Sequence, residues 1–142
     1  MRASLEVAVR EGRFGPALAL CDPLRRQSPT DPWLATVQAY SHFKLGQHEN
    51  AVVAAAEAVG LDAGNPTAAF VLGASNRNLG RHAEAARALL SAYELLPDRA
   101  DIAVLLLEET VTAQGLGPAR PLFQRISARV ADRRIAASWA RL

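Results

Sequence analysis

The stretch FVLGASNRNLGRHAEAARALLSAYELLP, from Phe70 to Pro97, contains two helix-forming segments that meet at Gly80. Alanine and leucine are frequent in both segments, and both residues favour helices. Glycine closes a helix because it adopts the left-handed conformation without steric cost, whereas proline cannot continue one. The stretch therefore predicts a helical hairpin that turns at Gly80 and ends at Pro97.

The same hairpin recurs along the chain every 34 residues. Three kinds of residue keep this period: glycines at the turn, alanines on the second helix and prolines at its two ends. The positions are Gly12, Gly46 and Gly80; Ala17, Ala51, Ala85 and Ala119; Pro16 and Pro118; and Pro29 and Pro97. A small alanine lets the second helix approach the first closely. A period of this length predicts stacked helical pairs, each packed against its neighbours.

This pattern resembles the tetratricopeptide repeat. The opening stretch carries the best match, through Leu72, Gly73, Gly80, Ala85, Leu89, Ala92 and Pro97. The resemblance covers almost the whole chain and implies an all-α fold, a right-handed superhelical solenoid of about three and a half hairpins plus a C-terminal capping helix. We expect a single domain over residues 1–142, with a partial repeat at about 1–31, full repeats at 32–65, 66–99 and 100–133, and the terminal helix at about 132–142.

Several positions depart from the family pattern. The large tryptophan and tyrosine of the family are replaced by small or polar residues, namely Ala35, Ala69 and Ala103, and His42, Asn76 and Thr110. The first repeat is expected to lack most of its first helix. Pro23 is expected to kink or split the second helix of that repeat. The turn glycine of the fourth repeat has moved to Gly115.

Composition and charge narrow the function classes. The net charge is +2 and the longest basic clusters are pairs of arginines, so the chain has no basic stripe of the kind that binds nucleic acid. No long apolar run is present, which argues against a secretory signal and against membrane insertion, and favours a cytoplasmic location. Cys21 is the single cysteine, so no disulfide forms within the chain.

We find no catalytic constellation, no metal site and no cofactor motif in the sequence. His48 and His82 occupy the same position of successive repeats, too far apart to share a metal ion. Cys21 is predicted to be a small buried core residue. Glu108 and Glu109 are adjacent on a helix and point about 100° apart, so they form no acid–base pair; Glu109 is expected to be solvated. The chain is therefore expected not to be an enzyme.

The family resemblance implies a concave groove lined by the first helix of each repeat. Carried over residue by residue, the groove positions are Arg2, Glu6, Val9 and Arg10; Trp33, Thr36, Tyr40, Phe43 and Lys44; Thr67, Phe70, Ala74, Arg77 and Asn78; and Asp101, Val104, Glu108, Val111 and Thr112. From these we predict that the residues that bind a peptide are Trp33, Thr36, Tyr40, Phe43, Lys44, Phe70, Arg77, Asn78 and Glu108.

The aromatic residues among them carry most weight, because four of the chain's eight aromatic rings fall in groove positions. Aromatic residues and arginine are the types that anchor interfaces. The alternative is that these rings are internal, with Trp33 closing the junction to the first repeat and Phe43 packing against the second helix of its own repeat.

One subtype of the family clamps the acidic tails of heat-shock chaperones with lysine and asparagine. In one register the corresponding positions hold Arg2, Glu6, Tyr40, Thr67 and Val71, and in the next Thr36, Tyr40, Ala74, Asp101 and Leu105. Neither set matches, so that ligand is disfavoured.

The predicted function is a non-catalytic protein–protein interaction module, a scaffold or chaperone-like adaptor that resembles small bacterial proteins of this build. Its expected partner is a peptide or helical segment of another protein. The alternative is a substrate-docking domain at the N-terminus of a larger enzyme, of the glycosyltransferase, sulfotransferase or 2-oxoglutarate hydroxylase type. An apolar stripe of Ile135, Trp139 and Leu142 favours a chain that continues, or a homodimer formed through the C-terminal helix.

Overall fold

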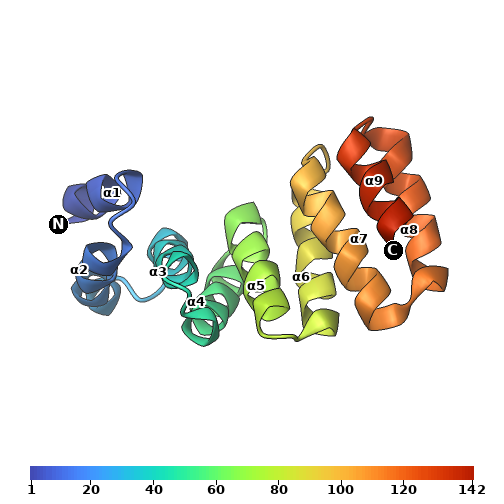
Figure 1. Cartoon of the computed structure of the whole chain (residues 1–142). Helices are drawn as coiled ribbons and strands as arrows, with labels where there is room; N and C mark the ends of the chain where they lie inside the picture. The colour runs from blue at the N-terminus through green and yellow to red at the C-terminus, as the bar shows by residue number, and fades with distance from the viewer.

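The computed structural model describes residues 1–142 and consists of helices without any strand. In order, the helices are α1 (Arg2–Arg10), α2 (Phe14–Gln27), α3 (Pro32–Lys44), α4 (His48–Leu61), α5 (Pro66–Asn78), α6 (His82–Leu95), α7 (Ala100–Gln114), α8 (Leu116–Arg129) and α9 (Arg133–Arg141). Consecutive hairpins follow one another along the molecule, and the two termini lie at opposite ends (Figure 1). The predicted all-α solenoid of helical hairpins is confirmed.

The turns inside the hairpins use glycine as predicted. Gly12, Gly46 and Gly80 have φ values of 74°, 77° and 76°, and the displaced Gly115 has a φ of 87°. Residues with a Cβ rarely adopt this region, and no other residue of the chain does so. Each glycine therefore fixes the point where the first helix of a hairpin ends and the second begins.

The helices that begin the second and third repeats share a second local device. The Asp31 side chain accepts a hydrogen bond from the Trp33 backbone N–H at 2.9 Å, and the Asn65 side chain accepts one from the Ala68 N–H at 3.2 Å. A proline follows each of these caps at the first helical position, where its missing N–H costs nothing. The caps matter for function because both side chains lie beside the largest hollow described below.

Small residues bring the helices together. The periodic alanines of the second helices are completely buried, and so are the alanines at the family's tryptophan position, or nearly so. At Gly73 the approach is closest, because a Cβ there would lie 2.7 Å from Cγ of Leu89 on α6. Packing at this distance holds α5 and α6 in a fixed register.

Two expectations for the first repeat are wrong. Helix α1 has 9 residues against 13 in α3, so most of the first helix is present. Helix α2 runs without interruption through Pro23 and is not split there. Proline removes one hydrogen bond of the ladder, but Cys21 and Leu24 on the same helix pack into the cluster formed with α1 and α3. That tertiary packing outweighs the local preference.

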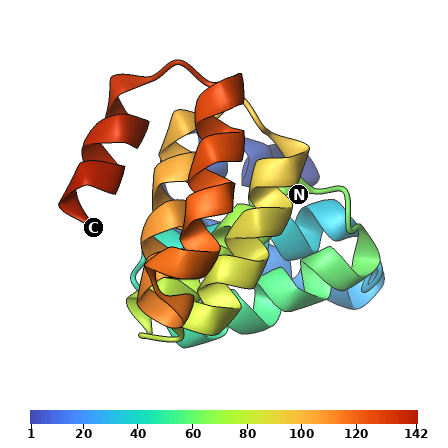
Figure 2. The same cartoon turned by 90° about the vertical axis from the view of Figure 1, so that its right-hand side faces the viewer.

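The C-terminal helix α9 covers the end of the solenoid. It packs mainly against α7, and the connection from α8 reaches it across one end of the helices (Figure 2). Ile135 is buried, and the Trp139 ring stacks on Phe123 of α8 with centroids 4.7 Å apart and 7° between the planes. Most of the apolar stripe is therefore covered within the chain, which removes the observation that favoured an enzyme domain or a homodimer there. No helix combines the length and the apolar character that crossing a membrane requires.

Cys21 is buried, as predicted, and this determines its chemistry. Burial raises the pKa of the Cys21 thiol to about 11, and the nearby Asp22 carboxylate adds to the rise. Against the ordinary value of 9.0, the reactive thiolate is roughly a hundredfold rarer at neutral pH. Because the unfolded chain loses this proton first, Cys21 lowers the free energy of unfolding as pH rises from about 9 toward 11.

We therefore expect Cys21 to resist alkylation by iodoacetamide in the folded protein and to react readily in urea. Mass spectrometry gives an unambiguous reading because the chain has a single cysteine. Equal alkylation rates with and without urea would contradict the buried position of this side chain.

Candidate functional site

Three aromatic rings from α3 and α5 line the face formed by the odd-numbered helices, and Phe14 of α2 adjoins them. Phe14 meets Tyr40 edge-on at 5.6 Å, and Phe43 meets Phe70 edge-on at 6.4 Å. Tyr40, Phe43 and Phe70 are half-buried, so each ring packs on one side and presents the other to solvent. We call this set the aromatic row. Phe43 also contacts His48 of α4 at 5.8 Å, which gives it the internal packing role that was the alternative.

A hollow of about 650 Å³ lies beside the aromatic row, at the N-terminal half of the same face. We call it the N-terminal hollow. Its walls come from α1, α3 and α5 and from the turns that precede α3 and α5, through Val9, Asp31, Pro32, Trp33, Thr36, Val37, Tyr40, Asp62, Asn65 and Thr67. Hollows with an apolar wall and a few polar groups are the usual places where proteins bind ligands.

Hydrogen bonds hold the polar wall of this hollow in place. The Thr36 hydroxyl donates to the Pro32 carbonyl at 2.7 Å and accepts from the Asn65 side-chain amide at 2.7 Å. Thr36 is only 9% exposed, and both of these bonds are internal. It therefore fixes the wall and offers little to a ligand, in contrast to its predicted binding role. Trp33 is half-buried and packs partly against the first repeat.

Cationic side chains of the chain itself lie on two rings of this face. The Arg2 guanidinium lies 4.3 Å above the Trp33 ring and forms an ion pair of 2.8 Å with Asp31. That hydrogen bond holds the pKa of the Asp31 carboxyl below its usual range. Lys44 is exposed, with its ammonium 5.4 Å from the centre of the Tyr40 ring. Both arrangements are cation–π contacts, so these rings are able to receive positive charge.

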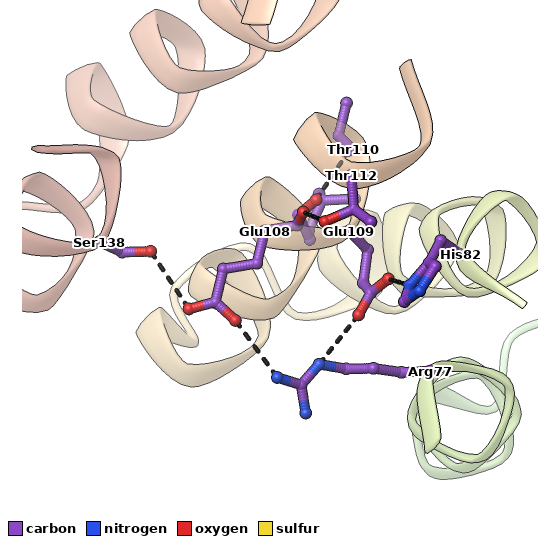
Figure 3. A network of polar contacts seen from close by, with 8 residues as sticks. Arg77, His82, Glu108, Glu109, Thr110, Thr112 and Ser138 are labelled. Carbon is purple, nitrogen blue, oxygen red and sulfur yellow. Dashed lines mark hydrogen bonds and ion pairs between the residues drawn. The ribbon is translucent and has the colours of Figure 1, made fainter. Parts of the chain in front are cut away.

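The C-terminal half of the face contains a network of charges instead of a hollow with aromatic walls (Figure 3). Arg77 donates from Nε to Glu109 at 2.9 Å and lies 3.5 Å from Glu108. The second oxygen of Glu109 accepts from Nδ1 of His82. Glu108 in turn accepts a long bond of 3.4 Å from the Ser138 hydroxyl. The network joins α5, α6, α7 and α9, and in Figure 3 the Arg77 guanidinium lies between the two carboxylates.

The expectation that Glu109 is solvated is wrong, because its side chain is only 4% exposed. The repeat explains the burial: Ser41, Ser75 and Glu109 are spaced by 34 residues and are all buried. A carboxylate in this position needs charged partners, and Arg77 and His82 supply them. Arg77 is thus bound within the chain and is not free to act as the anchor for a peptide carboxylate.

The remaining predicted residue, Asn78, is exposed and lies 3.4 Å from the His48 ring nitrogen. The structure thus brings Trp33, Thr36 and Tyr40 together in the hollow, places Phe43, Lys44 and Phe70 next to it, and groups Arg77 with Glu108 further along. The acidic groups Asp31 and Asp62 and the cap Asn65 were not predicted. A signal for the two caps was present, because the pairs Asp31-Pro32 and Asn65-Pro66 are also 34 residues apart.

Sequence comparison identifies the family. A family described as anaphase-promoting complex, cyclosome, subunit 3, matches residues 10–92, which is more than half of the chain. The chain belongs to this family of tetratricopeptide repeat proteins. The tetratricopeptide resemblance noted in the sequence is thereby confirmed. A search of curated proteins found no match.

Solved structures show the same tetratricopeptide fold. A crystal structure of MamA is 18% identical, with a TM-score of 0.77 over 87% of this chain and 72% of that chain. The first tetratricopeptide domain of Spaghetti (RPAP3), bound to the HSP90 peptide SRMEEVD, is 21% identical, with a TM-score of 0.73 over 78% of this chain and 88% of that chain. At this level of identity the likeness shows the fold alone.

Proposed function

We propose that this tetratricopeptide chain is a non-catalytic protein-interaction module that holds an extended or helical segment of a partner protein. The segment lies on the face of the odd-numbered helices, across the aromatic row and into the N-terminal hollow. The observation that carries the proposal is the position of Tyr40, Phe43 and Phe70, half-exposed next to a hollow of about 650 Å³. Aromatic anchors beside a pocket are the usual centre of an interface.

The tetratricopeptide domain of Spaghetti supports this proposal by analogy, because its title describes a bound peptide. That peptide, SRMEEVD, is rich in acidic residues at its C-terminal end. The hollow in the present chain has different charges, since its charged wall residues are the aspartates Asp31 and Asp62. The fold supports peptide binding, whereas these charges favour another class of peptide.

The proposal is tested with a pair of lysine substitutions. Thr67 is exposed in the wall of the hollow, and Val53 is 60% exposed on α4, outside it. Short random peptides displayed on phage are selected for binding to the unchanged chain, and the affinities of the best are measured by calorimetry. We expect Thr67→Lys to weaken them by about tenfold or more, the scale of an interface hot spot. Val53→Lys adds the same charge and is expected to change the affinities less than about twofold.

Both lysines are introduced at exposed positions, so thermal melts are expected to coincide with that of the unchanged chain. If the selected peptides lose affinity equally in the two variants, or in Val53→Lys alone, the proposed face is wrong.

A further inference from the structure

The N-terminal hollow is bordered by a site that already holds a guanidinium group. Asp31 faces the Arg2 guanidinium at 2.8 Å on one side, and the Trp33 ring lies 4.3 Å from it on another. A carboxylate and an indole face are the two groups that recognise an arginine side chain best, through charge-assisted hydrogen bonds and through cation–π stacking. The occupant here is a residue of the same chain.

Arg2 holds this position weakly. Its side chain is 52% exposed, and Asp31 is the single acid with which it forms an ion pair. Exposed ion pairs contribute little to stability, since water and salt compensate for their loss. A guanidinium that arrives with further contacts of its own can therefore replace Arg2 at small cost.

The hollow beside this site is negatively charged. Asp31 and Asp62 are its charged wall residues, and no lysine or arginine lines it. One Asp62 oxygen accepts from the Gly64 backbone N–H at 3.0 Å, and no cationic side chain is paired with this carboxylate. Tyr40 and Thr67 supply an aromatic and a hydroxyl surface between the two acids. A basic segment fits these charges, whereas an acidic one meets two carboxylates at close range.

We propose that the partner segment is basic and that one of its arginine side chains displaces Arg2, to lie on Trp33 against Asp31. This inference rests on the proposed function, because it names the chemistry of the segment that the same face holds. Arg2 then acts as an internal competitor that keeps the site covered until a partner arrives. Asp62 provides the charge for a second basic residue of the segment.

The site is tested with N-acetyl-arginine N-methylamide, and with the citrulline analogue, which keeps the shape but lacks the charge. The indole N–H signals of Trp33 and Trp139 are followed by NMR. We expect the arginine probe to shift the Trp33 signal and leave Trp139, at the far end of the solenoid, unchanged. Because a hydrogen bond to a charged group is the stronger kind, the citrulline probe is expected to bind about tenfold more weakly.

Two variants separate recognition from folding. Arg2→Ala removes the competitor and is expected to tighten the arginine probe by about two- to fivefold, the scale of an exposed ion pair. Asp31→Asn keeps the helix cap, because asparagine caps as well as aspartate, but removes the charge. It is expected to weaken the arginine probe by about tenfold and to leave the citrulline probe unchanged. Equal binding of both probes, or no effect of Asp31→Asn, would overturn the inference.

The selected peptides distinguish this inference from the function on which it rests. If Thr67→Lys weakens them while replacement of their arginines by citrulline does not, the binding face stands and the arginine site is wrong. If the arginine probe behaves as expected while the selected peptides ignore Thr67→Lys, the arginine site stands and the proposed function is wrong.

Discussion

Arg77→Ala is expected to lower the free energy of unfolding by about 2 kcal/mol, although this side chain is 42% exposed. Its partner Glu109 is 4% exposed and cannot recover its hydration when the arginine is lost. The carboxylate would retain the hydrogen bond from His82 alone. Leaving a buried acceptor without its charged donor costs far more than breaking a pair at the surface. Urea denaturation measures the change.

Arg81 is a matched control, because its side chain is also 42% exposed and it forms an ion pair of 2.7 Å. Its partner Glu49 is 66% exposed, so Arg81→Ala is expected to cost less than about 1 kcal/mol. In a Glu109→Leu background, Arg77→Ala is expected to cost little, which gives a coupling energy of roughly 1.5 kcal/mol or more in the double-mutant cycle. Equal losses for Arg77→Ala and Arg81→Ala would refute the buried network.

Ala85→Leu is expected to destabilise the protein by roughly 1–3 kcal/mol. Ala85 lies in the first turn of α6 and is completely buried against the rest of its hairpin. Nearby, Gly73 of α5 already approaches Leu89 of α6 so closely that a single added carbon would lie 2.7 Å from it. The hairpin therefore has no room for three further carbons, and either α6 or the leucine must leave its preferred position.

Ala83→Leu provides the control for this substitution, since Ala83 lies on the same turn of α6 and is exposed. Leucine and alanine have similar helix propensities, so this variant is expected to change the free energy of unfolding by less than about 0.5 kcal/mol. Equal urea midpoints for Ala85→Leu and Ala83→Leu would mean that the register of α5 and α6 is wrong.

Much of the fold could be predicted from the sequence because the repeat encodes it locally. The 34-residue period places the helix starts at Pro32, Pro66 and Ala100, where the structure has them. Glycine at the turn acts through its own backbone, so Gly12, Gly46 and Gly80 needed no knowledge of distant residues. Pro23 shows the limit of local reasoning, because packing by α1 and α3 keeps its helix continuous.

The candidate site was predicted less completely because its groups come from different repeats. Glu109 looked like a surface residue, and its burial depends on Arg77 and His82, which lie 32 and 27 positions earlier in the chain. The pairing of Arg2 with Asp31 and Trp33 likewise depends on how α1 packs beside α3. No period in the sequence shows such pairs, since each occurs in one repeat junction only. The arrangement of charge on the face therefore emerges only from the structure.

The central claim is that a partner segment lies on the face of the odd-numbered helices. It is tested most directly by placing the photoreactive residue p-benzoylphenylalanine at position 67, in the wall of the hollow, or at position 53, on the exposed side of α4. Each labelled chain is irradiated in native lysate and its cross-linked adducts are separated by mass. The account predicts a discrete adduct from position 67 that is absent from position 53. A shared adduct of equal yield, or one from position 53 alone, would contradict it.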